Sequence, residues 1–444
     1  MSIYATQRVP RLCMAIPATL SRALIIKMKP TVSIIVPTRN AGSEFCQLLE
    51  RVNTQKGSHH PEIIIVDSGS SDGTLDVARR FGANVIEISP ASFNHGSTRN
   101  LGIQHARGEI CVLLVQDALP IDSHWLESLI QHFDRDPLIC GVTSRQIPRP
   151  ETDIVARWEV EHHNNFLGHE VKIRSISDWG EFARLPLQDR FFMCNFDNVC
   201  SAIRRSAWEE HPFRPLVFAE DLDWAVRVLR AGNRIAYEPA AAVVHSHVRP
   251  AIYHLRRQYI SAKVVPEILE CPIPGAVSLN DQEFFRSVNH LTQEAFSFLL
   301  FASQLGRCIA PTEWRQWVKF AETAGVVEVS GEGQESRQLA REYARRLWSW
   351  LPVPDNFKSS PRLTARSHLR SLRDNRMRGH FFFLLSEVAE GVPELSPAVL
   401  RHLIVHCLAR TLGGYLGGYY LLSRSQGNIS PELYNVDQML CVGV

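Results

Sequence analysis

The segment FAEDLDWAVRVLRAG, residues 218–232, places three carboxylates, Glu220, Asp221 and Asp223, at the start of an amphipathic helical pattern. Two explanations for this concentration of negative charge are open. Carboxylates in the first turn of a helix interact favourably with the positive end of the helix dipole. A carboxylate at such a place can also act as a general base toward a bound substrate. The choice between them depends on what the rest of the chain brings to the same place.

Two further carboxylates follow expected strands. Asp67 ends EIIIVD, and Asp117 follows EICVLLVQ. In a parallel sheet the loops after the strands meet at one edge, so both side chains are expected there. Asp67 can accept hydrogen bonds from a base or a ribose, and Asp117 can hold a divalent cation together with a diphosphate and water. For each residue the alternative is an aspartate that only forms or caps a turn.

Two other segments carry candidate ligands. In VVHSH, His245 and His247 share one face of an extended segment, because side chains alternate along a strand. They are candidate cation ligands, with an ordinary core or surface histidine as the alternative. FNHGSTRN opens a helix that contains Arg99 and Asn100. Helix N-termini attract phosphate and arginine adds donors, although a capped helix with a solvated arginine would have the same sequence.

Strands and helices alternate through the first part of the chain and would position these residues. Strands are expected at 31–38, 62–67, 84–88 and 109–118, and helices at 43–55, 71–82, 97–108 and 122–133. This alternation predicts a parallel sheet with helices on both faces. The stretch 146–193 has no clear period, and strands are expected again around 200–204 and 234–247. PTRNAGSE follows the first strand in place of GxGxxG, which argues against a dinucleotide-binding fold.

Bulk properties limit the class of protein. The chain has 444 residues, a net charge of +2 and ten cysteines without CxxC spacing. These values do not suggest nucleic acid as a partner and favour a reduced, intracellular protein. Residues 1–30 are expected to be a disordered tail, or a segment preceding a true start at Met28. Residues 280–444 are helical in period, and no run reaches the ~20 apolar residues of a membrane-spanning helix. The best late candidate, HLIVHCLARTLGGYLGGYYLL, is interrupted by His406, Arg410 and four glycines.

Seven segments in order carry a specific resemblance: SIIVPTRN, IIIVDSGSSDGT, FNHGSTRNLGIQHARGE, VQDALP, NVCSAIRRSAWEEHPF, FAEDLDWAVRVLRAG and YEPAAAVVHSH. Together they resemble the family 2 glycosyltransferases, in particular their rhamnosyltransferase-like branch. The resemblance implies an α/β GT-A fold with a Rossmann-like mixed sheet at residues 31–262, after the tail at 1–30. A mostly helical C-terminal region, residues 263–444, follows it.

The resemblance also implies roles for individual residues. A nucleoside-diphosphate sugar of the dTDP or UDP type, with rhamnose as a candidate sugar, would be bound by Pro37, Arg39, Asp67, Arg99, Asn100 and Gln116. Asp117 matches the last residue of the family's metal-binding DxD, and His245 or His247 would add a ligand. The triplet here is Val115-Gln116-Asp117, so the first carboxylate for Mg²⁺ or Mn²⁺ is absent.

The family's Glu-Asp pair falls on Glu220-Asp221, with Asp221 as the catalytic base. The implied reaction is an inverting transfer of the sugar to a hydroxyl of a glycan or lipid-linked acceptor. The absent first aspartate leaves a degenerate sugar-binding or assembly subunit as an alternative. A nucleotidyltransferase of related fold is a second alternative, but it would need a basic triphosphate loop where only Arg39 is available.

A basic amphipathic stretch, residues 358–378, carries arginines at helical spacing. Such a helix can lie on an anionic membrane surface, which would suit a lipid-linked acceptor. We therefore expect a cytoplasmic protein with a peripheral contact at the inner face of the membrane. A solvated arginine face packed on the catalytic domain is the alternative.

Overall fold

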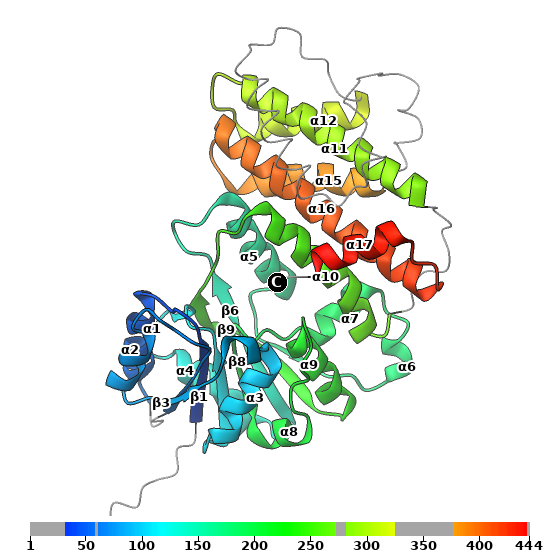
Figure 1. The fold of residues 1–444 in the computed structure, drawn as a ribbon. Coiled ribbons are helices and arrows are strands. Elements are labelled where there is room, and N and C mark those ends of the chain that lie inside the picture. Colours follow the sequence, from blue (N-terminus) through cyan, green and yellow to red (C-terminus); the bar gives the residue numbers. More distant parts are fainter. Residues whose placement is uncertain (1–31, 58–60, 272–280, 325–375, 442–444) are drawn as a thin grey trace, which may run out of the picture.

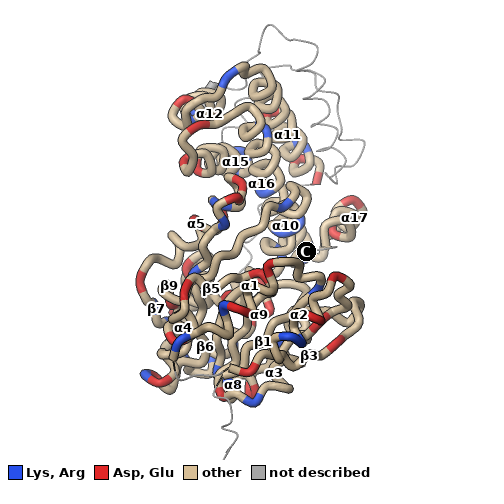
Figure 2. Tube along the Cα trace, turned by 90° about the vertical axis from the view of Figure 1, so that its left-hand side faces the viewer, with Lys and Arg blue, Asp and Glu red and all other residues tan. Residues whose placement is uncertain are grey.

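The computed structural model describes residues 32–57, 61–271, 281–324 and 376–441. It has a region built on one sheet and a region of helices, with α5 (Ile154–Leu167) and α10 (Ala251–Ile268) lying between them (Figure 1). Acidic and basic residues are interspersed along the trace of both regions (Figure 2). The expected tail at 1–30 and residues 358–375 of the basic stretch lie outside the described residues.

The sheet is mixed, with strand order β3-β2-β1-β4-β8-β6-β9-β5, and β7 pairs with β9. The strands are β1 (Val32–Thr38), β2 (Glu62–Asp67), β3 (Asn84–Glu87), β4 (Ile110–Leu114), β5 (Leu119–Pro120), β6 (Ile139–Ile147), β7 (Lys172–Arg174), β8 (Cys200–Arg204) and β9 (Arg234–Val244). The strands β1 to β4 are mutually parallel, β8 is antiparallel to both of its neighbours, and β6 is parallel to β9. The prediction of a mixed α/β sheet followed by a helical region is confirmed.

Helices cover both faces of the sheet, which is why β1 is apolar along its whole length. Ile34 and Val36 pack in one hydrophobic cluster and Ile35 in another, on opposite faces. The helices of this region besides α5 are α1 (Glu44–Asn53), α2 (Thr74–Arg80), α3 (His95–His105), α4 (Trp125–Arg135), α6 (Trp179–Phe182), α7 (Leu187–Cys194), α8 (Arg205–Glu210) and α9 (Glu220–Arg230), with the 3₁₀ turn η1 (Pro90–Ser92).

The stretch without a clear period contains regular structure that the sequence did not reveal. It holds the end of β6, then α5, β7, α6 and α7. Strand β6 was missed because polar residues and Gly141 interrupt its apolar pattern. A Cβ at Gly141 would lie 2.6 Å from the Phe196 ring and 2.9 Å from the Trp224 ring, so glycine is required for these rings to pack against the strand.

The described part of the helical region contains α11 (Asp281–Gln304), α12 (Pro311–Ala324), α15 (Arg376–Glu387), the 3₁₀ turn η3 (Val388–Gly391), α16 (Pro397–Ser425) and α17 (Pro431–Leu440). α16 packs along α10, and a Cβ at Gly413 or Gly417 would lie 2.2 Å from a backbone oxygen of α10. The glycines therefore allow the close approach of two helices and do not interrupt α16. Of the described helices, none is long and apolar enough to cross a membrane. The domain boundary at residue 262 falls inside α10 and stays a prediction.

Candidate active site

The loop after β2 is organised around Asp67, which is almost completely buried. One carboxylate oxygen accepts hydrogen bonds from the hydroxyls of Thr38 (2.8 Å) and Ser70 (2.5 Å). The other accepts from the backbone N–H groups of Gly69 (3.0 Å) and Ser70 (2.8 Å). Asp67 therefore fixes this loop against the end of β1, and its contact with a nucleotide stays a prediction.

The segments after β1 and β4 are joined by Gln116. Its side-chain Oε1 accepts a hydrogen bond from the backbone N–H of Arg39 (2.8 Å), and its Nε2 donates to the carbonyl of the same residue (3.3 Å). The Arg39 residue is exposed and Pro37 is partly buried beside it. Three predicted donor-binding residues thus lie together, next to Asp117.

Asp117, His245 and His247 form one cluster, with one ligand atom from each within 4.8 Å of the others. His247 Nε2 lies 3.3 Å from Asp117 Oδ2 and 3.1 Å from His245 Nε2, and His245 Nε2 lies 3.8 Å from Asp117 Oδ1. The short strand β5 produces this proximity, because it pairs with β9 so that Leu119 lies opposite Val244. Two imidazoles and a carboxylate are suitable ligands for a divalent transition-metal cation, so the residues present fit the predicted site.

Burial favours the uncharged form of both histidines. It lowers the pKa of His245 to about 4 and also lowers the pKa of His247, although the charge of Asp117 opposes both shifts. A neutral imidazole has a lone pair with which to bind a cation. The cluster can therefore accept a cation near neutral pH without first losing protons from its histidines.

Two residues that the sequence did not indicate support this cluster. Gln146, in β6, places its Oε1 2.8 Å from Nδ1 of His245 and donates from Nε2 to Asp197 Oδ2 at 2.5 Å. The β6–β9 pairing brings Gln146 opposite Val243. Only this long-range register places a glutamine beside the histidine, so no local pattern could have revealed it.

The predicted base, Asp221, contacts the turn that follows Asp197. Asp221 Oδ1 accepts from the N–H of Leu222 (2.8 Å) and Oδ2 from the N–H of Asn198 (3.3 Å). Burial, and then the charges of Glu220 and Asp197, raise the pKa of Asp221 to about 7, and Arg99 opposes the change. A carboxylate with a pKa near neutrality is suited to take a proton from a hydroxyl.

Arg99 and Glu220 are buried and paired, with Nη1 2.5 Å from Oε1. Arg99 Nη2 also donates to the carbonyl of Asn198 (3.3 Å). Arg99 thus connects the Glu220–Asp221 pair to the turn that Asn198 belongs to. Its predicted contact with a donor diphosphate stays a prediction.

Asn100 lies on a different face of α3 and is occupied by protein partners. Its Nδ2 donates to the Phe213 carbonyl (2.8 Å), and its Oδ1 accepts from Trp208 Nε1 (2.8 Å) and the Phe213 N–H (3.1 Å). These bonds hold the segment that precedes α9. Asn100 is therefore a structural support in this conformation, and its predicted role in donor binding is untested.

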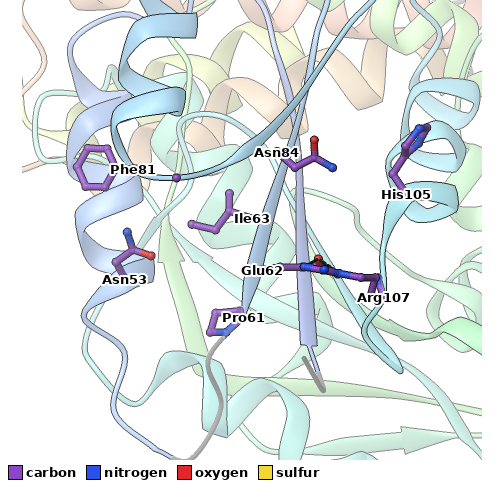
Figure 3. A pocket seen from close by; sticks show the side chains of 9 residues that line it. Asn53, Pro61, Glu62, Ile63, Phe81, Asn84, His105 and Arg107 are labelled. Carbon is purple, nitrogen blue, oxygen red and sulfur yellow. Dashed lines mark hydrogen bonds and ion pairs between the residues drawn. The ribbon is translucent and has the colours of Figure 1, made fainter. Parts of the chain in front are cut away.

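A hollow lies away from these residues, at the amino-terminal ends of β2 and β3 (Figure 3). It has a volume of about 420 Å³ and is lined by Asn53, Pro61, Glu62, Ile63, Phe81, Gly82, Asn84, His105 and Arg107. Across it, Arg107 and Glu62 form an ion pair of 2.7 Å. The predicted site residues are all elsewhere, at the ends of β1, β2, β4 and β9, in α3 and at the start of α9.

Comparison with known proteins identifies the family. The family described as Glycosyl transferase family 2 matches residues 33–211. The chain is 34% identical over 222 residues to the O-antigen chain rhamnosyltransferase WbaN of Salmonella anatum, covering 49% of this chain and 67% of that protein. It is 32% identical over 220 residues to the O-antigen chain rhamnosyltransferase RfbN of Salmonella typhimurium, covering 49% and 66%. The alignments thus span about two thirds of these relatives.

Among solved structures, a mannosyltransferase from Pyrobaculum calidifontis in complex with GDP-Man and Mn²⁺ is 18% identical with a TM-score of 0.40, over 74% of this chain and 82% of that one. TarS 1–349 from S. aureus is 14% identical with a TM-score of 0.41, over 90% and 95%. On the sequence matches, the chain belongs to glycosyl transferase family 2 and is a glycosyltransferase.

Proposed function

We propose that this protein is an inverting glycosyltransferase that moves a sugar from a nucleoside-diphosphate donor to a hydroxyl of a glycan or lipid-linked acceptor, with Asp221 as the base. The observation that carries the proposal is the turn at residues 197–199. Its Asn198 N–H binds Asp221, and its Asp197 binds the glutamine that supports His245. Both contacts support the proposal that the base and the candidate cation ligands belong to one site.

In the proposed reaction Asp221 takes the proton of the acceptor hydroxyl as that oxygen attacks the anomeric carbon. The raised pKa of Asp221 makes it basic enough for this step, and the Arg99–Glu220 pair holds its backbone in place. A single carboxylate is sufficient, because a diphosphate leaves without needing a proton from a second acid.

Asp117, His245 and His247 are the residues that would hold a divalent cation. A cation bound there supplies positive charge that stabilises the departing diphosphate. Arg149 supports this position, since its Nη2 donates to the Asp117 carbonyl (2.7 Å) and its Nη1 to Glu44 (3.0 Å). The first aspartate of the DxD is missing, but the second histidine keeps the number of candidate ligands at three.

The donor and acceptor are proposed from the relatives. WbaN and RfbN are named O-antigen chain rhamnosyltransferases, so we propose rhamnose as the transferred sugar, carried on dTDP or UDP, and a growing surface polysaccharide as acceptor. A contact with the membrane through residues 358–378 would suit a lipid-linked acceptor and stays a prediction.

A donor panel tests the proposal. The full chain would be incubated with dTDP-rhamnose and with UDP- and GDP-sugars, in Mn²⁺ or in EDTA, and release of the nucleoside diphosphate measured. We expect turnover of one donor class that requires the cation and is abolished by Asp221→Asn. Donor binding without turnover in any condition would favour a degenerate subunit.

A further inference from the structure

A chain of hydrogen bonds runs from Asp197 to the candidate cation ligands. Asp197 Oδ2 accepts from Gln146 Nε2 at 2.5 Å, and Gln146 Oε1 lies 2.8 Å from His245 Nδ1. The second oxygen of Asp197 accepts from the backbone N–H of Val199 at 2.8 Å. Each link of this chain has only one chemically sensible direction, and that direction determines where His245 carries its proton.

The direction is set at the carboxylate. An ionised carboxylate can only accept, so Gln146 must present its amino group to Asp197 and its oxygen to His245. The amide oxygen can only accept in turn, so Nδ1 of His245 must carry a proton. A neutral imidazole has one such proton, and Nε2 is therefore left with a lone pair.

The lone pair points to the place where a cation would bind. His245 Nε2 lies 3.1 Å from His247 Nε2 and 3.8 Å from Asp117 Oδ1. We propose that Asp197 is a positioning residue that, through Gln146, holds His245 in the tautomer whose Nε2 can bind a divalent cation. The proposal rests on the proposed cation site of the glycosyltransferase.

The identity of residue 197 is decisive, because an amide at this position would reverse the direction of each hydrogen bond between residue 197 and His245. In Asp197→Asn the Val199 N–H still requires an acceptor, so the new amide directs its oxygen there and its NH₂ group toward Gln146. Gln146 then accepts from it, turns its own NH₂ group toward His245, and forces the proton from Nδ1 to Nε2. A protonated Nε2 cannot bind a cation, although the shape of the site is almost unchanged.

The experiment measures Mn²⁺ binding to the full chain by electron paramagnetic resonance, with Mn²⁺ as the only ligand. Loss of a group that orients a metal-binding histidine typically weakens affinity 10- to 100-fold, and we expect Asp197→Asn to weaken Mn²⁺ binding by about that factor. Asp189→Asn, the same change at an exposed residue of α7, should bind Mn²⁺ like the unaltered protein. Equal affinity in Asp197→Asn and the unaltered protein would overturn the proposal.

Two further measurements separate the tautomer from a general structural effect. The ¹⁵N shifts of labelled histidine in the metal-free protein should show the His245 proton on Nδ1, and on Nε2 in Asp197→Asn. Gln146→Met breaks the chain, so the double variant should bind Mn²⁺ no more weakly than the weaker single variant. Additive losses, or an unchanged tautomer, would refute the route through Gln146.

Failure of the cation site itself gives a different result. Asp117→Asn removes the negative charge of a predicted ligand and should weaken Mn²⁺ binding at least as much as Asp197→Asn. If Asp117→Asn binds Mn²⁺ normally, the proposed site is wrong. If Asp117→Asn weakens binding and Asp197→Asn does not, only the role of Asp197 is refuted.

Discussion

Replacing Asp221 by asparagine is expected to abolish catalysis and, at alkaline pH, to stabilise the fold. The pKa of Asp221 is raised from its ordinary value of 3.8 to about 7, chiefly by burial and then by Glu220 and Asp197. Between pH 3.8 and pH 7 the folded protein therefore keeps a proton on Asp221 that the unfolded chain has released. The contribution of Asp221 to the free energy of unfolding is fully present below pH 3.8 and is lost as the pH rises toward 7.

The size of this effect follows from the shift. A pKa difference of one unit corresponds to about 1.4 kcal/mol, so ionisation of Asp221 costs the fold at most roughly 4 kcal/mol above pH 7. Contact of the partly buried side chain with water reduces this figure. Asparagine has no charge to bury, and its oxygen can still accept from Asn198 or Leu222. The stability of Asp221→Asn relative to wild type should thus increase by about 2 to 4 kcal/mol between pH 4 and pH 8.

Catalysis gives the second half of the prediction. Because the base must be ionised, wild-type kcat/KM should fall about tenfold for each pH unit below 7. Loss of a general base typically costs 10²- to 10⁴-fold, and Asp221→Asn should show this full loss above pH 7 and lack the acidic limb of the wild type. Glu220→Gln removes a neighbouring negative charge and frees Arg99, so its acidic limb should move to lower pH.

The assays are urea unfolding at several pH values and nucleotide release from pH 5 to 9. Asp223→Asn is the matched control, because Asp223 is in the same helical turn but pairs with Arg214 (3.1 Å) and Arg227 (2.9 Å). It should keep the acidic limb near pH 7 and most of the transfer rate. If Asp221→Asn and wild type unfold with the same pH dependence, the raised pKa is wrong. Transfer by Asp221→Asn within tenfold of wild type refutes the base.

Three other predictions concern the cation, the nucleotide and the helical region. EDTA should stop transfer and added Mn²⁺ should restore it. Asp117→Asn should need at least tenfold more Mn²⁺ for half-maximal activity. Turnover that does not depend on a cation would contradict the proposed cation site. Asp67→Ala loosens the loop after β2 and should weaken nucleoside-diphosphate binding about tenfold, as measured by calorimetry. An unchanged Kd would show that the nucleotide binds elsewhere. Gly413→Ala puts a Cβ 2.2 Å from the Leu255 carbonyl and should destabilise by about 1–3 kcal/mol. Gly414→Ala has nothing within 4 Å and should stabilise by up to about 1 kcal/mol, so equal melting temperatures would contradict the close packing.

Much of the α/β region could be predicted because its elements are local and apolar. β1, β2 and β4 are runs of β-branched residues or leucine, and their side chains are buried on both faces of the sheet. The helices between them have a clear helical period. The segment of β6 to α7 could not be predicted, because its strand is polar at its end and contains a glycine required by two aromatic rings. The order of the strands after β4, and hence which loops meet, also depends on pairings between distant segments.

The candidate site was predicted in part for the same reason. Asp117 and His245 are strand-end residues, and the family resemblance, not the strand pattern, assigned them to one cation site; the structure places them in one cluster. Gln146 and Asp197 were missed, because only the β6–β9 register and the turn before β8 bring them to His245. Arg99 was expected at the donor but pairs with Glu220, 121 positions away, which no local pattern indicates.

The contacts of α16 indicate why the helical region accompanies this site. His406 Nε2 lies 3.0 Å from the carbonyl of Arg249, two residues after His247, and His402 Nε2 lies 3.0 Å from Asp153 at the start of α5. Arg410 is paired with Glu159, further along α5. α16 therefore contacts the segment that follows the cation ligands of β9 and the helix that follows β6. β6 carries the glutamine that contacts His245, and β9 leads into the two histidines. Both strands therefore continue into segments that α16 contacts. The helical region is thus part of the framework that positions the candidate cation ligands.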